Sequence, residues 1–335
     1  MYVLYIGNKR SLHRSNPTSL DTLSGQLQQD GFNVRTVSSY SNKLFRLVHM
    51  WLTIIRYSST TDIVLIDTYS TLNFWYAYTC SVWCRLFKLP YVPILHGGNL
   101  PTRFQRNPKQ AMALVNYAYR TVIPSTYLQE HLKPYHIPRS VVIPNTLELA
   151  NYPFHLRTMP PLRLLWVRAI DAIYNPEMAL QTLVILRKTH LDAQLTMVGP
   201  YKGISEHEWQ QTLEKYQLPV TMTGSLSKTA WIALAKEHTV FINTTTIDNM
   251  PVSVMEAMAL GLPVVSTNVG GMPYLIEQEV TGLLVPSNDS EAMAQAIVSL
   301  LLDPNKTQRI ITQARERILA YDWSNVRLKW LDLLR

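Results

Sequence analysis

The stretch DNMPVSVME (residues 248–256), continued by AMALGLPVV (257–265), places two carboxylates eight positions apart around a proline. Pro251 is suited to the first turn of a helix, where its missing N–H would have no intrahelical partner in any case. The free N–H groups of that turn, together with the helix dipole, form an anion site. Asp248 is expected in the loop before the helix and Glu256 one to two turns inside it. The stretch therefore predicts a site for a phosphorylated, polyhydroxylated ligand.

On both sides of this stretch, short apolar runs alternate with amphipathic segments, which predicts parallel sheets with helices on both faces. The expected strands are Val3–Ile6, Val34–Val37, Ile63–Ile66, Val92–Leu95, Thr121–Ile123, Val141–Ile143, Arg163–Val167, Gln194–Val198, Val220–Thr223, Val240–Asn243, Pro263–Ser266 and Leu283–Val285. The expected helices lie near 19–30, 42–57, 71–87, 107–119, 126–132, 175–189, 205–217, 227–237, 252–260 and 289–302, and 305–335 is expected to be wholly helical.

The pattern is interrupted once, in the proline-containing segment from Thr146 to Pro161, which is the expected linker. The fold class is therefore α/β, with two Rossmann-like domains over residues 1–157 and 158–321. Ligands of such sheets bind outside the carboxyl ends of the strands, so the expected pocket is the cleft between the domains.

Composition limits the class of protein. With 335 residues, 47% hydrophobic and 16% charged, the chain is long enough for two globular domains. The apolar run at 72–87 contains Arg85 and is shorter than the roughly 20 residues that span a bilayer, and the start has no signal-peptide pattern. We therefore expect a cytoplasmic protein. Cys80 and Cys84 are expected to be a buried, reduced pair, because no further metal ligands lie near them in sequence.

Charge is divided unevenly, with net +10 in residues 1–157 and −2 in residues 158–335. An anionic membrane surface or a phosphorylated acceptor would suit the basic half, whereas no nucleic-acid-binding motif is present. The segment KLFRLVHMWLTIIRY (43–57) combines bulky apolar residues with three cations, which is compatible with a helix on an anionic leaflet. A solubilising charge bias and a helix that only packs on its own sheet remain the alternatives.

Several motifs together resemble the retaining glycosyltransferases of family 4, which have the GT-B fold. They are the 248–265 stretch with the following STNVGGMPYLI (266–276), LLWVRAI (164–170), LTMVGP (195–200) and VTMTGSLS (220–227). VIPSTYLQEHL (122–132) and VVIPNTLE (141–148) are similar to the last strands before the linker, and the closing segment (about 322–335) to a helix that crosses back to the first domain. The resemblance implies an acceptor-binding first domain and a second domain that binds a nucleotide sugar.

The same resemblance assigns roles within the 248–256 stretch. Glu256 would hold the ribose hydroxyls of the donor, and Asp248 would contact the transferred sugar, although the family has the longer Glu at this position. The diphosphate and sugar would face the backbone N–H groups of Asn249, Met250 and Val252.

Arg168 matches the arginine that bridges the donor diphosphate, a role that suits a planar guanidinium. The lysine that the family usually has about five residues later is missing from DAIYNP (171–176). Asn175 is expected to donate a hydrogen bond there without bringing a charge, and Lys9 or Arg10 is a candidate for the missing cation.

In the first domain, His96 follows a buried strand and matches the histidine that faces the transferred sugar and the acceptor. Gly7, where the first strand ends, is expected at the donor. The loop from Gly7 to Pro17 is rich in basic residues, which would suit an anionic acceptor.

The implied reaction is a retaining, metal-independent hexosyl transfer from a nucleotide diphosphate sugar to the hydroxyl of a glycan or of a lipid-linked acceptor. The expected context is polysaccharide or glycolipid assembly at the inner membrane face. No cofactor and no metal are expected. A nucleotide-sugar epimerase of the same architecture and a non-catalytic nucleotide-sugar-binding subunit are the alternatives.

Overall fold

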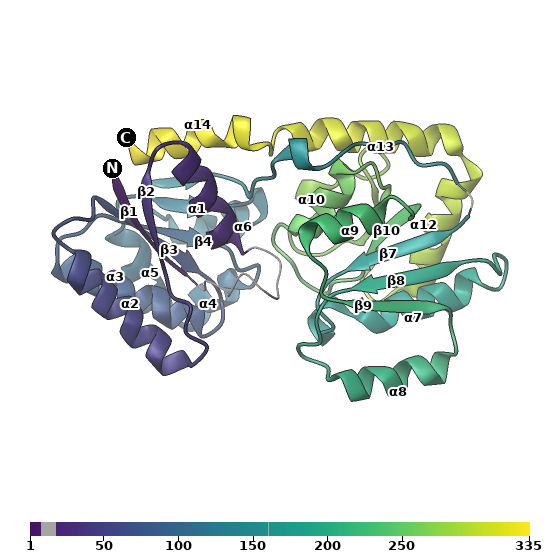
Figure 1. Cartoon of the computed structure of the whole chain (residues 1–335), viewed down its shortest axis with the longest axis horizontal. Coiled ribbons are helices and arrows are strands. Elements are labelled where there is room, and N and C mark those ends of the chain that lie inside the picture. The colour runs from purple at the N-terminus through teal and green to yellow at the C-terminus, as the bar shows by residue number, and fades with distance from the viewer. Residues whose placement is uncertain (8–17, 160) are drawn as a thin grey trace. The chain divides into compact units, whose positions relative to one another are not determined.

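The computed structural model describes residues 1–7, 18–159 and 161–335. The chain forms two compact units (Figure 1), and each contains a parallel sheet covered by helices. Unit 1 comprises Met1–Asn145 with Val326–Arg335, and unit 2 comprises Thr146–Asn325. Lys9 and Arg10, the candidates for the missing cation, lie outside the described residues.

Unit 1 is built on six parallel strands in the order β2-β1-β3-β4-β5-β6. They are β1 (Tyr2–Ile6), β2 (Asn33–Val37), β3 (Ile63–Thr68), β4 (Tyr91–Leu95), β5 (Thr121–Ile123) and β6 (Ser140–Val142). The α-helices are α1 (Ser19–Gln29), α2 (Lys43–Tyr57), α3 (Asn73–Leu86), α4 (Leu100–Arg106), α5 (Pro108–Asn116) and α6 (Thr126–Leu132).

Unit 2 repeats the plan with strand order β12-β11-β10-β7-β8-β9. Its strands are β7 (Arg163–Val167), β8 (Gln194–Val198), β9 (Val220–Gly224), β10 (Val240–Asn243), β11 (Val264–Thr267) and β12 (Leu283–Val285). Its α-helices are α7 (Pro176–Leu186), α8 (Glu206–Tyr216), α9 (Lys228–Ala235), α10 (Val252–Ala259), α11 (Met272–Leu275), α12 (Ser290–Leu302) and α13 (Pro304–Leu319), after which α14 (Trp323–Leu334) leads into unit 1.

The central strands are mainly apolar and are buried along their whole length, because both faces of each sheet are covered. Every residue of β3, β4 and β10 is buried. In unit 2 the covering helices form two separate cores, one on each face, and α10 lies in the core that also contains Trp231 and Ile318. This packing fixes the position of α10 and of the loop that precedes it.

All twelve expected strands are confirmed, each within two residues at either end. The helix α4 was not expected, because proline and asparagine are frequent around Pro101 and, read from the sequence alone, favour a loop. Pro101 instead occupies the first turn of α4, where proline is tolerated.

The expectation that 305–335 is wholly helical was wrong at Ala320–Asp322. The backbone there pairs with the start of unit 2: Leu147 N–H donates to the Tyr321 carbonyl, and Trp323 N–H donates to the Leu147 carbonyl. The Asp322 carboxylate accepts from Leu149 N–H at 2.9 Å and from Ser324 N–H at 2.8 Å. The break is therefore fixed by hydrogen bonds to residues 147–149, and Asp322 caps α14.

The same contacts explain where the units divide. The boundary lies after Asn145 rather than after residue 157, because Leu147, Leu149 and Tyr152 belong to the apolar core of unit 2. At the other end, α14 is tied to unit 1 by an Arg327–Asp30 ion pair of 3.0 Å.

Among the described residues, no helix combines the length and the apolar character that crossing a membrane requires.

We expect Asp322→Ala to lower the free energy of unfolding by about 1–2 kcal/mol, because the helix cap and the bond to Leu149 are lost together. Partial burial raises the pKa of Asp322, but the hydrogen bonds from Ser324 and Leu149 outweigh it and hold this pKa below its usual value. The stabilisation is therefore present at neutral pH and shrinks as the pH falls through that lowered pKa. Urea unfolding at pH 7 and pH 3 measures both effects.

Asp332→Ala is the matched control, since Asp332 is an exposed carboxylate near the other end of α14. Equal unfolding curves for Asp322→Ala and Asp332→Ala at pH 7 would contradict the capping role.

Candidate functional site

The loop between β10 and α10 is held by two glycines from the loop after β11. Gly271 N–H donates to the Asp248 carbonyl at 2.9 Å. A Cβ at Gly270 would lie 2.1 Å from the Asp248 carbonyl oxygen, and one at Gly271 would lie 1.5 Å from that of Asn249. The two backbones are therefore in direct contact, which only glycine permits, and the GG pair sets the position of Asp248.

Arg168 and Asp248 form an ion pair at the carboxyl ends of β7 and β10. Arg168 Nη2 donates to Asp248 Oδ2 at 2.6 Å, and its Nε donates to Asn243 Oδ1 at 3.4 Å. The guanidinium also lies over the Tyr174 ring, 5.0 Å from its centroid. The other carboxylate oxygen of Asp248 accepts from Asn249 N–H at 2.8 Å. The Asp248 side chain, although shorter than the Glu of the family, is thus long enough to reach Arg168 from this loop.

Glu256 is a buried carboxylate inside α10, only 3% exposed. Its Oε1 accepts from Tyr152 Oη at 2.8 Å and is also the partner of the Lys228 ammonium. No described residue donates to Oε2. A buried charge must be paired to be tolerated. Glu256 is therefore fixed through one of its two carboxylate oxygens.

The titration behaviour of two tyrosines supports this arrangement. Burial, and then the neighbouring Glu256 carboxylate, raises the pKa of Tyr152 well above its usual range, so Tyr152 is a protonated donor at all ordinary pH values. Burial likewise raises the pKa of Tyr174, in opposition to the nearby Arg168 cation.

The first turn of α10 is oriented as the sequence predicts. Pro251 is the N-cap residue and makes no side-chain cap bond, while its carbonyl accepts from Val254 and Met255 N–H. No described group accepts from the N–H of Val252 or of Ser253. A helix start without a capping side chain leaves its N–H groups and its positive dipole end for an anion.

Asn175 is the N-cap residue of α7. Its side-chain oxygen accepts from Met178 N–H, and its side-chain nitrogen donates to Asn288 at 2.8 Å. The structure therefore gives Asn175 a capping role that the sequence analysis did not anticipate, and its contact with a donor remains a prediction.

In unit 1, His96 belongs to a buried polar cluster at the carboxyl ends of β1, β3 and β4. His96 Nε2 lies 2.9 Å from Asp67 Oδ1, and Tyr5 Oη donates to the same oxygen at 2.8 Å. The His96 ring stacks on Tyr69 with 5.2 Å between centroids. Burial, and then the Asp67 carboxylate, raises the pKa of Tyr5. Asp67 thus fixes the orientation of the His96 imidazole.

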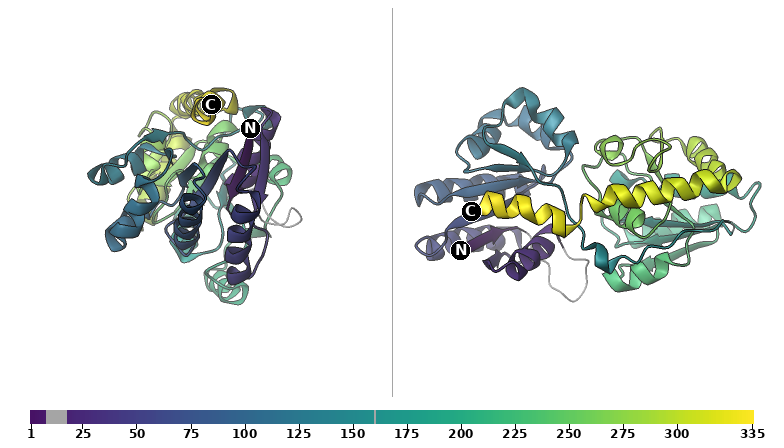
Figure 2. Two further views of the ribbon diagram at one scale, coloured as in Figure 1. Left: turned by 90° about the vertical axis from the view of Figure 1, so that its left-hand side faces the viewer. Right: turned by 90° about the horizontal axis from the view of Figure 1, so that it is seen from above.

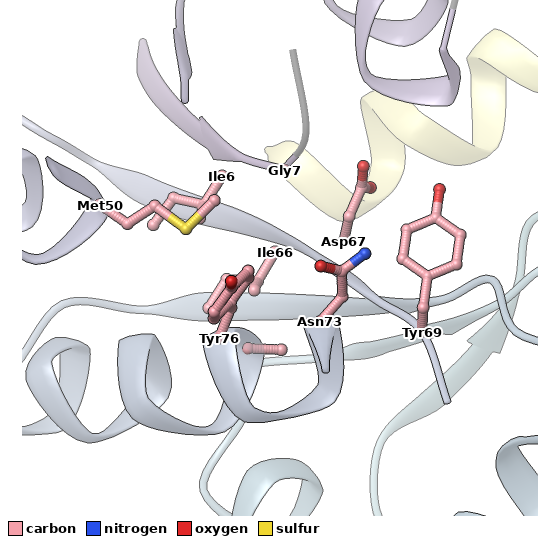
Figure 3. Close-up of a pocket in the computed structure, with 9 residues that line it drawn as sticks. Ile6, Gly7, Met50, Ile66, Asp67, Tyr69, Asn73 and Tyr76 are labelled. Carbon is pink, nitrogen blue, oxygen red and sulfur yellow. The ribbon is translucent and has the colours of Figure 1, made fainter. Parts of the chain in front are cut away.

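A pocket adjoins this cluster, and it has an apolar and a polar side (Figure 3). Ile6 and Met50 lie on one side, and Asp67, Tyr69 and Asn73 on the other. Gly7 also lines it, and a Cβ at Gly7 would lie 2.5 Å from Asp67 Oδ2. The cavity is small, with room for about one water molecule.

The part of the chain that the structure describes contains no group of three or more His, Cys, Asp or Glu side chains suited to holding an ion. Cys80 and Cys84 are both buried and free.

The structure brings together the expected pair Arg168 and Asp248 and places Asn249, Met250 and Val252 at the start of α10. It adds Lys228 and Tyr152, which the sequence analysis missed. Lys228 lies at the start of α9 and Tyr152 in the segment taken for a linker. Asp67 was also missed, although a carboxylate directly after an apolar strand, as in IVLIDT (63–68), is a signal that could have identified it.

Comparison with known proteins agrees with this architecture. The family described as Glycosyl transferases group 1 matches residues 154–317. The putative colanic acid biosynthesis glycosyltransferase WcaL of Escherichia coli K12 is 34% identical over 130 residues, which cover 36% of this chain and 31% of WcaL. A glycogen synthase of Mycobacterium tuberculosis H37Rv is 28% identical over 191 residues, covering 55% of this chain and 45% of that enzyme. The matches thus span less than half of either relative.

Solved structures resemble the whole chain. Anabaena HepE in complex with UDP-glucose has a TM-score of 0.82 at 17% identity, with 100% of this chain and 99% of that chain covered. Sucrose-phosphate synthase from Thermosynechococcus elongatus has a TM-score of 0.80 at 18% identity, with 99% and 98% covered. At such identities the likeness concerns the fold. The chain thus has the GT-B fold, and its residues 154–317, just under half of its length, match the family described as Glycosyl transferases group 1.

Proposed function

We propose that the chain is a retaining, family 4 glycosyltransferase that moves a hexosyl group from a nucleotide diphosphate sugar to an acceptor hydroxyl. The observation that carries the proposal is the half-satisfied carboxylate of Glu256, next to the uncapped start of α10 and the Arg168–Asp248 pair. One site then offers an acceptor for ribose hydroxyls and donors for a diphosphate, the two chemistries of a nucleotide sugar.

The donor would lie with its ribose on Glu256 Oε2 and its diphosphate at the N–H groups of Val252 and Ser253. Arg168 engages Asp248 through Nη2 and Asn243 through Nε, and its Nη1 has no described partner. That group remains to bridge a phosphate oxygen. Asp248 would receive hydroxyls of the sugar to be transferred.

Catalysis on this proposal rests on charge and orientation. The departing diphosphate gains negative charge, which Arg168 and the α10 dipole stabilise. The leaving phosphate oxygen takes the proton of the acceptor hydroxyl on the same face of the sugar, so the anomeric configuration is retained. His96, fixed by Asp67, would contact the transferred sugar and the acceptor. No metal or other cofactor is needed in this scheme.

The setting we propose is assembly of a surface polysaccharide or glycolipid by a cytoplasmic protein that binds peripherally to the inner membrane face. Two glycosyltransferase relatives, WcaL and AmsK of Erwinia amylovora, are named for biosynthesis of the polysaccharides colanic acid and amylovoran.

Glu256→Ala and Arg168→Ala are each expected to reduce transfer by about two orders of magnitude or more, because each removes a charged partner of the donor. Transfer from labelled UDP-, GDP- and ADP-sugars, with product mass as the readout, measures the effect. Glu214→Ala and Arg309→Ala, which change exposed residues of the same unit, should retain normal rates.

Normal turnover of either site variant would refute the assignment. Epimerised sugar formed from donor alone would favour the epimerase alternative, and donor binding without any turnover would favour the non-catalytic subunit.

Lys228 and Tyr152 are expected to act by positioning Glu256. Tyr152→Phe removes only the hydroxyl and should raise the donor KM about tenfold with a smaller change in kcat, since one neutral hydrogen bond to the carboxylate is lost. Lys228→Ala should have a larger effect, because it leaves a buried carboxylate without its cation. Lys236→Ala, an exposed lysine just after the same helix, is the control. Unchanged donor KM in both variants would argue against the positioning role.

Transfer is expected to continue in excess EDTA, because Arg168 and the helix start supply the positive charge that a divalent ion would otherwise bring. The measurement is the initial rate after dialysis against chelator. Loss of activity that magnesium restores would show that the proposed charge stabilisation is incomplete.

A further inference from the structure

Helix α2 of unit 1 has two apolar faces. One packs on the sheet through the buried residues Met50 and Ile54. The other is exposed, and we call it the α2 stripe: Leu44, Phe45, Val48, Leu52 and Ile55. Positions 44, 48, 52 and 55 are spaced by one helical turn and therefore form a continuous row along the outside of the helix. A helix needs only one apolar face to pack on a sheet, so the second has another purpose.

Three of the five side chains of the stripe are more than half exposed. Leu44 is 68% exposed, Phe45 64% and Leu52 58%. Isolated exposed leucines are common on protein surfaces, but five bulky apolar side chains on one face of one helix form a contiguous patch.

Helix α3, which packs against α2, extends the patch. Val82, Leu86 and Phe87 are exposed on α3 and directly after it. Trp51 of α2 donates to Thr79 and lies 6.2 Å from the Trp83 ring, which in turn stacks on Phe87. Half-buried tryptophans at the edge of an apolar patch are typical of surfaces that meet the interfacial region of a bilayer.

The charged residues of α2 and α3 are all positive. The chain contains no Asp or Glu between Asp30 and Asp62, nor between Asp67 and Glu130, so α2 and α3 lack carboxylates entirely. The cations on these helices and at their ends are Lys43, Arg46, Arg56, Arg85 and Lys88. Within unit 1 as a whole, 18 Lys and Arg against 6 Asp and Glu leave a net charge of +12.

We propose that unit 1 docks onto an anionic lipid bilayer through the α2 stripe and the neighbouring surface of α3. A helix with a bulky apolar outer face and basic flanks is bound by insertion of the apolar side chains below the headgroups and by attraction of the cations to anionic lipids. The absence of carboxylates from α2 and α3 favours a uniformly anionic surface over a protein partner, whose surface presents charges of both signs.

The docking surface also connects to the pocket of unit 1. Met50 of α2 and Asn73 and Tyr76 of α3 line that pocket, and Tyr76 Oη donates to the Lys43 carbonyl at the start of the stripe. The same helices thus form the pocket wall and the docking surface. If the proposed transfer is correct, docking would bring unit 1 to the surface where a lipid-linked acceptor lies, whereas docking itself does not depend on the transfer.

Flotation with vesicles tests the docking without any assay of activity. The full chain should float with vesicles of phosphatidylcholine and about 30% phosphatidylglycerol, and bind pure phosphatidylcholine at least tenfold more weakly. Leu44→Glu/Leu52→Glu should abolish flotation. Both positions are exposed, and a glutamate at 44 lies in the first turn of α2, where a negative charge is favourable, so the fold is retained.

Leu191→Glu/Leu302→Glu is the matched control, because it replaces two leucines of unit 2 that are 75% and 80% exposed with the same change in charge. It should float as the unmodified chain does. Arg56→Ala provides an independent variant, expected to weaken binding to the anionic vesicles about fivefold, an effect that disappears at high salt.

Three results would overturn the proposal: no flotation of the unmodified chain with anionic vesicles, equal flotation of the two double variants, or a lipid-free dimer that Leu44→Glu/Leu52→Glu converts to a monomer. The last would assign the α2 stripe to a second copy of the chain. Because no donor is present, none of these results bears on the proposed transfer.

Discussion

A buried carboxylate with one satisfied oxygen is the constraint on which the site in unit 2 depends. Glu256 cannot be buried in α10 unless its charge is compensated, and the compensation comes from Lys228 on α9 and Tyr152 in the segment before β7. Three segments far apart in the chain must therefore fold around one atom, Oε1. The second oxygen, Oε2, is engaged by no described residue, and under the proposed function it accepts from the donor ribose. On the proposed function, one oxygen of this side chain thus serves stability and the other serves recognition of the donor.

Asp248 is likewise held in place by several neighbouring residues. Its backbone is fixed by Gly270 and Gly271, and its side chain is fixed by Arg168. The sequence has Asp at this position, where the family has the longer Glu. In the structure the Asp248 carboxylate forms a 2.6 Å ion pair with Arg168 across the ends of β7 and β10. Tyr174, next to Asn175, packs below the Arg168 guanidinium and helps to hold this cation in place.

Whether a feature could be predicted from the sequence depends on how far apart in the chain the interacting residues lie. The strands depend on local apolar runs that are buried on both faces, so their positions could be read directly. The 248–256 stretch could also be recognised locally, through Pro251 and two acids eight positions apart. The Tyr152–Glu256 contact joins residues 104 positions apart, and the Lys228–Glu256 contact joins residues 28 apart. No periodicity records such pairings, so these partners could be found only in the structure.

The break at Ala320–Asp322 shows the same limit at the level of the backbone. Helix propensity continues through this segment, but pairing with Leu147 interrupts it, and the pairing exists only because residues 146–152 pack into unit 2. Once those residues are counted with unit 2, the charge of the chain divides as +12 for unit 1 and −4 for unit 2. The positive charge is thus more strongly concentrated in unit 1 than the sequence halves suggest. It is gathered in the unit whose α2 and α3 carry an exposed apolar surface without one carboxylate, which is the combination that an anionic bilayer requires.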